Sequence, residues 1–184
     1  MTSSANKQHG VFAIELAMVL LGLSLIIVFT MDVVVKQSAK GKLDRLSYST
    51  VSLLKERNQL FDGEETMTYS EMSQAFQLVA KSMRNTMGTF EISRLGMYVE
   101  QQRFDADKRP VPAIQNVHIY RLGSYPCAPD DRLENMIHLA PVTQFDNRLT
   151  LYRVTLCYRT DNWFGELVGG QFERARSIAT SFGR

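Results

Sequence analysis

The sequence predicts an α+β fold, in which a long N-terminal helix and a second helix precede an antiparallel sheet that forms a head domain. Three observations predict this order. The first sixty residues contain no proline and carry apolar side chains at helical spacing. A helix-capping signal opens at Thr68, and alternation of apolar and polar residues starts only after Gly88. Because the helices come before the strands instead of alternating with them, the layout is α+β.

The first predicted helix has a membrane part and a soluble extension. Residues 16–31 carry no charge, and the apolar run of residues 11–35 supplies the ~20 residues that a membrane-spanning helix needs. Gly41 costs a helix about 1 kcal/mol relative to alanine and marks a candidate bend. Beyond it, one apolar stripe follows at helical spacing. The stripe consists of Leu43, Leu46, Val51, Leu54 and Leu60.

A polar break at Asp62–Glu65 separates this helix from a second one. Thr68 and Glu71 have the spacing of a capping box, and apolar residues follow them at helical spacing until Gly88 stops the helix. The strands are predicted from alternation and β-rich composition. They cover residues 90–95, 97–99, 117–122, 149–158 and a final edge strand at 178–182. Asp161–Asn162 is expected to form a turn.

Charge and length restrict the class of protein. The chain has 184 residues, with 21 Lys+Arg against 19 Asp+Glu and a net charge of +2, and its length favours one domain. No basic stretch dominates, which argues against a nucleic-acid binder. The one concentrated basic patch directly follows the apolar run, so membrane lipid with anionic headgroups is its natural partner. The patch comprises Lys36, Lys40, Lys42 and Arg45.

Residues 11–35 have three interpretations. A cleaved secretory signal requires an apolar run of roughly 7–15 residues followed by a small-residue cleavage site, and this run is too long and lacks the site. A plain transmembrane helix leaves Glu15 unexplained, although a carboxylate there costs about 2.5–3.5 kcal/mol on insertion scales. The third interpretation places a cut directly before the run, after Gly10, so that the apolar helix stays on the mature protein.

Gly10, the apolar run and Glu15 together resemble the class III signal of type IV pilins and pseudopilins. In that family a prepilin peptidase cuts after the glycine, and a glutamate stands five residues into the mature chain. Residues 13–17, Ala-Ile-Glu-Leu-Ala, are most similar to the TadE/TadF minor pseudopilins of tight-adherence (Tad/Flp) pili, and the TadF branch is favoured. The resemblance covers about 25 residues.

The resemblance implies an organisation and a set of roles. Residues 1–10 would be the leader, 11–35 the transmembrane assembly helix and 36–184 a periplasmic α+β head. Gly10 and Val11 would form the processing site, and Glu15 would pair with the N-terminal amine of a neighbouring subunit. The implied partners are TadE-like minor pilins, the major Flp pilin, the prepilin peptidase and the inner-membrane assembly platform. The implied function is to prime or cap pilus assembly for adhesion and biofilm formation.

Two features depart from this pattern. The leader holds only Lys7 and His9, whereas such leaders are often more basic. The four positive charges of the basic patch lie on the side that should be exported, and the positive-inside rule alone favours the opposite orientation.

The two cysteines, Cys127 and Cys157, lie in no metal-type or redox motif. If the head is exported, the oxidising compartment favours a disulfide between them. The alternative is two unrelated buried thiols, because free cysteine is commonly buried.

No catalytic or metal site is expected, and no cofactor. No pair of histidines has metal-ligand spacing, and both a G-x-S-x-G motif and a glycine-rich phosphate loop are absent from the sequence. The protein is therefore expected not to be an enzyme. Trp163 and Phe164 are expected to plug the end of a core, with a partner-anchoring role as the alternative.

Three rival functions remain open. A type II secretion pseudopilin shares the processing signal. A signal-anchored periplasmic binding or sensory domain would keep Met1 on an uncleaved helix. A membrane-anchored enzyme is disfavoured because the sequence offers no catalytic constellation.

Overall fold

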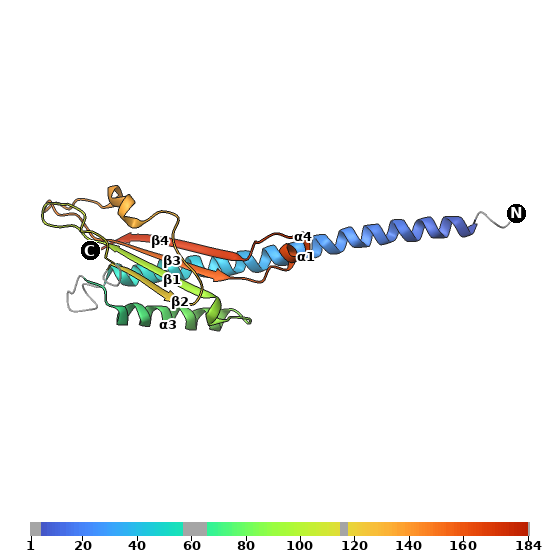
Figure 1. Ribbon diagram of the computed structural model, residues 1–184, viewed down its shortest axis with the longest axis horizontal. Coiled ribbons are helices and arrows are strands. Elements are labelled where there is room, and N and C mark those ends of the chain that lie inside the picture. The colour runs from blue at the N-terminus through green and yellow to red at the C-terminus, as the bar shows by residue number, and fades with distance from the viewer. Residues whose placement is uncertain (1–4, 57–65, 115–117, 184) are drawn as a thin grey trace. The chain divides into compact units, whose positions relative to one another are not determined.

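The computed structural model describes residues 5–56, 66–114 and 118–183, and it begins with one uninterrupted helix. This helix, α1 (Ala5–Lys55), confirms the predicted long N-terminal helix (Figure 1). It includes residues 5–10 of the predicted leader and continues through Gly41. The predicted polar break at Asp62–Glu65, and Leu60 at the end of the predicted stripe, lie outside the described residues.

The second helix, α3 (Tyr69–Thr86), begins at the predicted capping box. The backbone N–H of Glu71 donates to the Thr68 hydroxyl at 3.4 Å, and the N–H of Thr68 donates to the Glu71 carboxylate at 2.8 Å. These two bonds satisfy donors that the first helical turn leaves without intrahelical partners. The helix ends two residues before Gly88, as predicted.

Four antiparallel strands form one sheet in the order β2-β1-β3-β4. The strands are β1 (Leu95–Gln102), β2 (Ile119–Gly123), β3 (Leu151–Arg159) and β4 (Arg174–Phe182). The predicted antiparallel sheet is confirmed, and β4 is the expected edge strand, although it starts four residues earlier than predicted. The α+β fold class is therefore confirmed.

The strand predicted at residues 90–95 is wrong. A single 3-10 turn, η1 (Ile92–Arg94), occupies this stretch, and β1 starts only at Leu95. The N–H of Arg94 donates to the Glu91 carbonyl at 3.1 Å, and the Arg94 guanidinium also bonds the Glu91 carboxylate. An alternating pattern of six residues is too short to distinguish, from the sequence, a strand from a turn that its own side chains stabilise.

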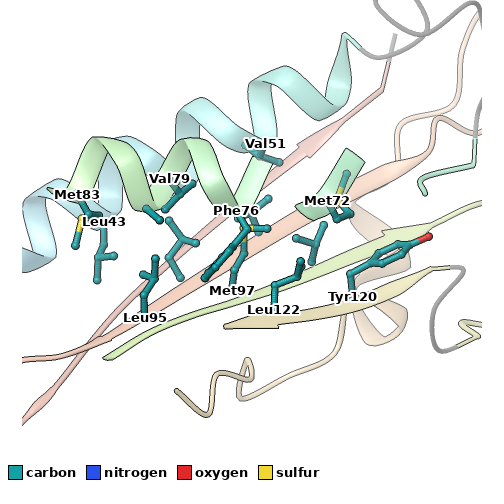
Figure 2. Close-up of a cluster of buried hydrophobic side chains, with 14 of the residues drawn as sticks. Leu43, Val51, Met72, Phe76, Val79, Met83, Leu95, Met97, Tyr120 and Leu122 are labelled. Carbon is teal, nitrogen blue, oxygen red and sulfur yellow. The ribbon is translucent and has the colours of Figure 1, made fainter. Parts of the chain in front are cut away.

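The main core lies between the sheet and two helical segments, α3 and the C-terminal part of α1. Figure 2 shows Phe76 and Met83 of α3 directed toward the face of the sheet that carries Leu95 and Met97. Because successive side chains of a strand point to opposite faces, the alternate residues of β1 and β3 form this layer. They are Leu95, Met97, Val99, Tyr152, Val154, Leu156 and Tyr158. From α1, Leu43, Val51 and Leu54 of the predicted stripe are buried against it.

The opposite face of the sheet is covered by the long connection between β2 and β3. That connection contains a 3-10 segment, η2 (Leu133–Leu139), and contributes to a small apolar cluster. Leu133, Ala140 and Leu151 are buried there, with Phe104 and Met136 packed beside them. The sheet is therefore covered on both faces, which explains why every residue of β1 is buried.

The chain divides into two compact units. One comprises residues 38–160 and 174–184 and contains the sheet, α3 and both clusters. The other comprises residues 1–37 and 161–173, so the connection between β3 and β4 belongs with the N-terminal helix. That connection contains a short helix, α4 (Trp163–Val168), which follows the predicted turn directly.

Candidate functional site

The N-terminal part of α1 exposes an almost wholly apolar surface. The large side chains from Val11 to Met31 are exposed nearly without exception, and none of the most apolar window is buried. Among the described residues this is the one helix long and apolar enough to cross a membrane. Such a surface is stable only in lipid or against other apolar helices. The helix fits a single-pass membrane anchor.

Glu15 is the sole charged residue between Val11 and Met31. Its side chain is exposed, and no hydrogen bond or ion pair to its carboxylate occurs within the part of the chain that the structure describes. Val11 and Glu15 are one helical turn apart and share a face of α1. Gly10 lies directly before them in the same helix, about 7.5 Å along the axis from Glu15.

A second carboxylate, Asp32, closes the apolar stretch. It is only 5% exposed, and it forms an ion pair with Lys36 one turn further along α1. The Lys36 ammonium also lies 3.4 Å from the Asn162 side-chain oxygen and 5.9 Å from the centre of the Phe172 ring. This pair is not among the sequence-based predictions, although an Asp and a Lys four residues apart on a helix are a signal for it.

The connection that carries α4 packs on the same stretch of α1. The Phe164 ring meets the Phe29 ring edge-on, with centroids 4.9 Å apart and planes at 69°. Trp163, by contrast, is 52% exposed and lines an open groove of about 520 Å³. The other groove residues are Ile27, Thr30, Met31, Val34 and Val35 of α1. The prediction that Trp163 plugs the end of a core is therefore wrong. Its side chain remains available to a further partner.

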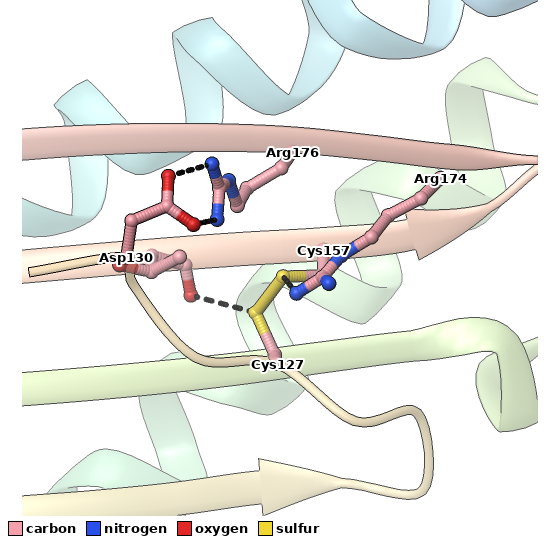
Figure 3. Close-up of a disulfide and its surroundings, with 6 residues drawn as sticks. Cys127, Asp130, Cys157, Arg174 and Arg176 are labelled. Carbon is pink, nitrogen blue, oxygen red and sulfur yellow. Dashed lines mark hydrogen bonds and ion pairs between the residues drawn. A yellow bond between two sulfur atoms is a disulfide. The ribbon is translucent and has the colours of Figure 1, made fainter. Parts of the chain in front are cut away.

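The predicted disulfide between Cys127 and Cys157 is confirmed (Figure 3). It ties the connection after β2 to β3, with the two Cα atoms 5.5 Å apart and 30 residues between them in sequence. Gly96 of β1 permits this approach, because a Cβ there would lie 2.2 Å from the Tyr125 carbonyl oxygen. The segment that carries Cys127 therefore packs directly over β1 at Gly96, where a side chain would not fit.

A bidentate ion pair holds the same connection to the edge strand. The Arg176 guanidinium donates two hydrogen bonds to Asp130, one of them at 2.6 Å (Figure 3). These bonds lower the pKa of the Asp130 carboxyl and raise the pKa of Arg176. Beside the disulfide, the pair fixes the connection over β3 and β4.

No group of three or more His, Cys, Asp or Glu side chains is placed to hold a metal ion in residues 5–56, 66–114 and 118–183. What the geometry offers is an apolar helix with one isolated carboxylate. A sequence model of TadF, described as "Putative tight adherence pilin protein F", matches residues 4–184.

The chain belongs to the TadF family. Neither the curated proteins nor the solved structures compared with it give a match. TadF membership makes the chain a pilin-like component of a tight-adherence pilus, with pilus-associated partners. The match covers the sheet and both of its helices as well as residues 10–15, whereas the resemblance carried by residues 10–15 reaches only about 25 residues.

A buried carboxylate makes the stability of this TadF head dependent on pH. Glu100 of β1 is 3% exposed, and one of its oxygens accepts the Leu133 N–H at 3.1 Å. The other oxygen has no partner among the described residues. Burial raises the pKa of Glu100, while the Leu133 hydrogen bond and the charge of Arg153, which faces it from β3, act in the opposite direction.

We expect the Glu100 contribution to favour unfolding as pH rises. A carboxyl whose pKa is raised in the folded state binds protons more tightly there than in the unfolded state. Its contribution to the stability of the fold is therefore complete below the ordinary glutamate pKa, and it is lost as pH rises through the raised pKa. Glu100→Gln should increase the free energy of unfolding at neutral pH and remove this decline. The measurement is urea unfolding of the detergent-solubilised chain at several pH values. Asp130 makes the free energy of unfolding increase with pH at low pH, which is the opposite trend. Both proteins contain Asp130, so the difference between wild type and Glu100→Gln at each pH isolates the contribution of Glu100. Parallel pH profiles for the two proteins would contradict the assignment.

Proposed function

We propose that this protein is a minor pseudopilin of a tight-adherence pilus, which primes or caps filament assembly for adhesion and biofilm formation. The observation that carries the proposal is Glu15, an isolated carboxylate on an exposed apolar helix, five residues beyond Gly10. A charge in hydrocarbon is retained at a cost, and pairing with an opposite charge offsets part of that cost.

Cleavage after Gly10 would create the opposite charge. The new α-amine of Val11 would stand one helical turn from Glu15, so each mature helix would present a cation and an anion at the same end. Helices packed side by side can then exchange these charges, the amine of one subunit meeting the carboxylate of its neighbour. In low dielectric such a pair attracts strongly and fixes the axial register of the two helices.

The proposed partners are those that the resemblance to the TadE/TadF pseudopilins implies. They are TadE-like minor pilins, the major Flp pilin, the prepilin peptidase and the inner-membrane assembly platform. Residues 11–35 would anchor the subunit in the inner membrane, and residues 36–184 would form the periplasmic head. The Cys127–Cys157 disulfide supports export, because disulfides persist in oxidising compartments.

Sequencing the N-terminus of membrane-extracted protein tests the proposal. Co-expressed with its prepilin peptidase, the chain should begin at Val11, and Gly10→Leu should keep residues 1–10. Gly22→Leu is the matched control, because a side chain at Gly22 meets nothing within 4 Å, so its processing should be unchanged. A wild-type chain that retains Met1 would contradict the proposal and favour an uncleaved signal anchor.

A further inference from the structure

The connection between β3 and β4, residues 161–173, exposes large apolar side chains beside the exposed polar residues Glu166 and Gln171. Four of its large side chains are each more than half exposed although the segment packs on α1. They are Trp163, Leu167, Val168 and Phe172. A cluster of this kind on a short segment marks a surface that another apolar phase or molecule covers.

The position of this segment along α1 coincides with the end of the membrane span. At 1.5 Å per residue, a hydrocarbon core of about 30 Å that starts at Val11 ends near Met31. Asp32 and Lys36 indicate the same boundary independently. Charged side chains are costly inside the hydrocarbon core, so an ion pair at this position fits the end of the span. Residues 161–173 contact α1 from Phe29 to Lys36, so they lie on both sides of this boundary.

The chemistry of the segment fits the same depth. Trp163 borders a groove that is continuous with the apolar surface of the span, since the other side chains lining it belong to α1 residues 27–35. Phe172 instead lies beside the Lys36 ammonium, at the polar end. Tryptophan is enriched where hydrocarbon meets headgroups, and short apolar segments beside basic residues bind at that depth.

We propose that residues 161–173 form an interfacial membrane anchor. Trp163, Leu167, Val168 and Phe172 insert into the boundary between headgroups and acyl chains, and an acyl chain fills the groove beside Trp163. The inference rests on the proposed membrane placement of α1. It gives the subunit a second attachment to lipid, contributed by the head sequence, in addition to the spanning helix.

Trp163 reports on this directly, because it is the only tryptophan in the chain. The full chain is reconstituted at low density in vesicles of phosphatidylcholine and phosphatidylglycerol. Trp163 emission should be blue-shifted, quenched by lipids brominated near the carbonyl end of the acyl chain, and protected from aqueous iodide. The matched control is Trp163→Phe combined with Phe145→Trp, which moves the probe to a head residue that is 87% exposed. Its iodide quenching should be several-fold stronger, and bromolipid should have no effect.

Two results would overturn the anchor. Iodide quenching of Trp163 equal to that of the control would place it in water. Protection from both quenchers would mean that protein, such as a second copy, covers it. Extraction with alkaline carbonate distinguishes a wrong interfacial anchor from a wrong membrane placement of α1. A chain that stays in the membrane while Trp163 is aqueous contradicts only the interfacial anchor, whereas a chain that is released contradicts both.

Discussion

A chain carrying Glu15→Gln is expected to be cleaved and inserted in the membrane, yet to be missing from the assembled pilus. The substitution keeps the size of the side chain and removes its charge, so the amine of the neighbouring Val11 would be left without a partner. Breaking a buried ion pair by removing one member costs about 3–5 kcal/mol. Since 1.4 kcal/mol is a factor of ten, association between subunits should weaken roughly a hundred-fold to several thousand-fold. The measurement is the ratio of this protein in sheared pili to that in membranes.

The matched control for this experiment is Glu15→Asp, which keeps a carboxylate at the same position. It should restore a large part of the incorporation, and both variants should show the wild-type N-terminus. Normal incorporation of Glu15→Gln would contradict the pairing role. Failure of Glu15→Asp and Glu15→Gln alike would mean that a carboxylate at this position is not sufficient and that assembly also requires the reach of the longer side chain.

Removing both cysteines, as Cys127→Ala with Cys157→Ala, should lower the free energy of unfolding by about 3–4 kcal/mol. The bridge closes a loop of 30 residues. In the chain-entropy model, removing it restores conformational entropy to the unfolded chain, which lowers the free energy of unfolding by this amount. A loss of this size is a large part of the stability of a single domain. It is measured by urea unfolding of the detergent-solubilised protein.

Reductant provides the control for the cysteine experiment. It should destabilise the oxidised wild type to nearly the level of the double variant, and it should leave the variant unchanged. If the variant is as stable as the oxidised protein, the bridge contributes nothing, and the other contacts of the connection, among them the Asp130–Arg176 pair, are enough to hold it over the sheet.

Local signals made the helices and most strands predictable. The Thr68 capping box lies within four residues, and the alternation of residues 149–158 is long enough to identify β3. The short α4 has no comparable signal, because six residues around Gly165 cannot show a helical period. At residues 90–95, a hydrogen-bonded turn replaced the strand that a brief alternation predicts.

The contacts of the candidate site were predictable only where they are local. Gly10, Val11 and Glu15 lie within six residues, and their roles remain proposals. The packing of Phe164 on Phe29 joins residues far apart in the chain, and no sequence pattern encodes such a contact. Likewise, Glu100 faces Arg153 only because of the register between β1 and β3, which periodicity does not determine.

The spacing of the two carboxylates on α1 has a consequence for the bilayer itself. The uncharged stretch of residues 16–31 measures about 24 Å along the helix, less than the ~30 Å of a hydrocarbon core. A lone subunit that keeps Glu15 and the Asp32–Lys36 pair at the two membrane surfaces would thin the surrounding membrane, at a fraction of a kcal/mol per Å. If a neighbour neutralises Glu15 as proposed, the apolar length would extend back to Val11 and reach about 31 Å, which matches the core. Relief of this elastic deformation would then draw processed subunits together before any contact between their heads.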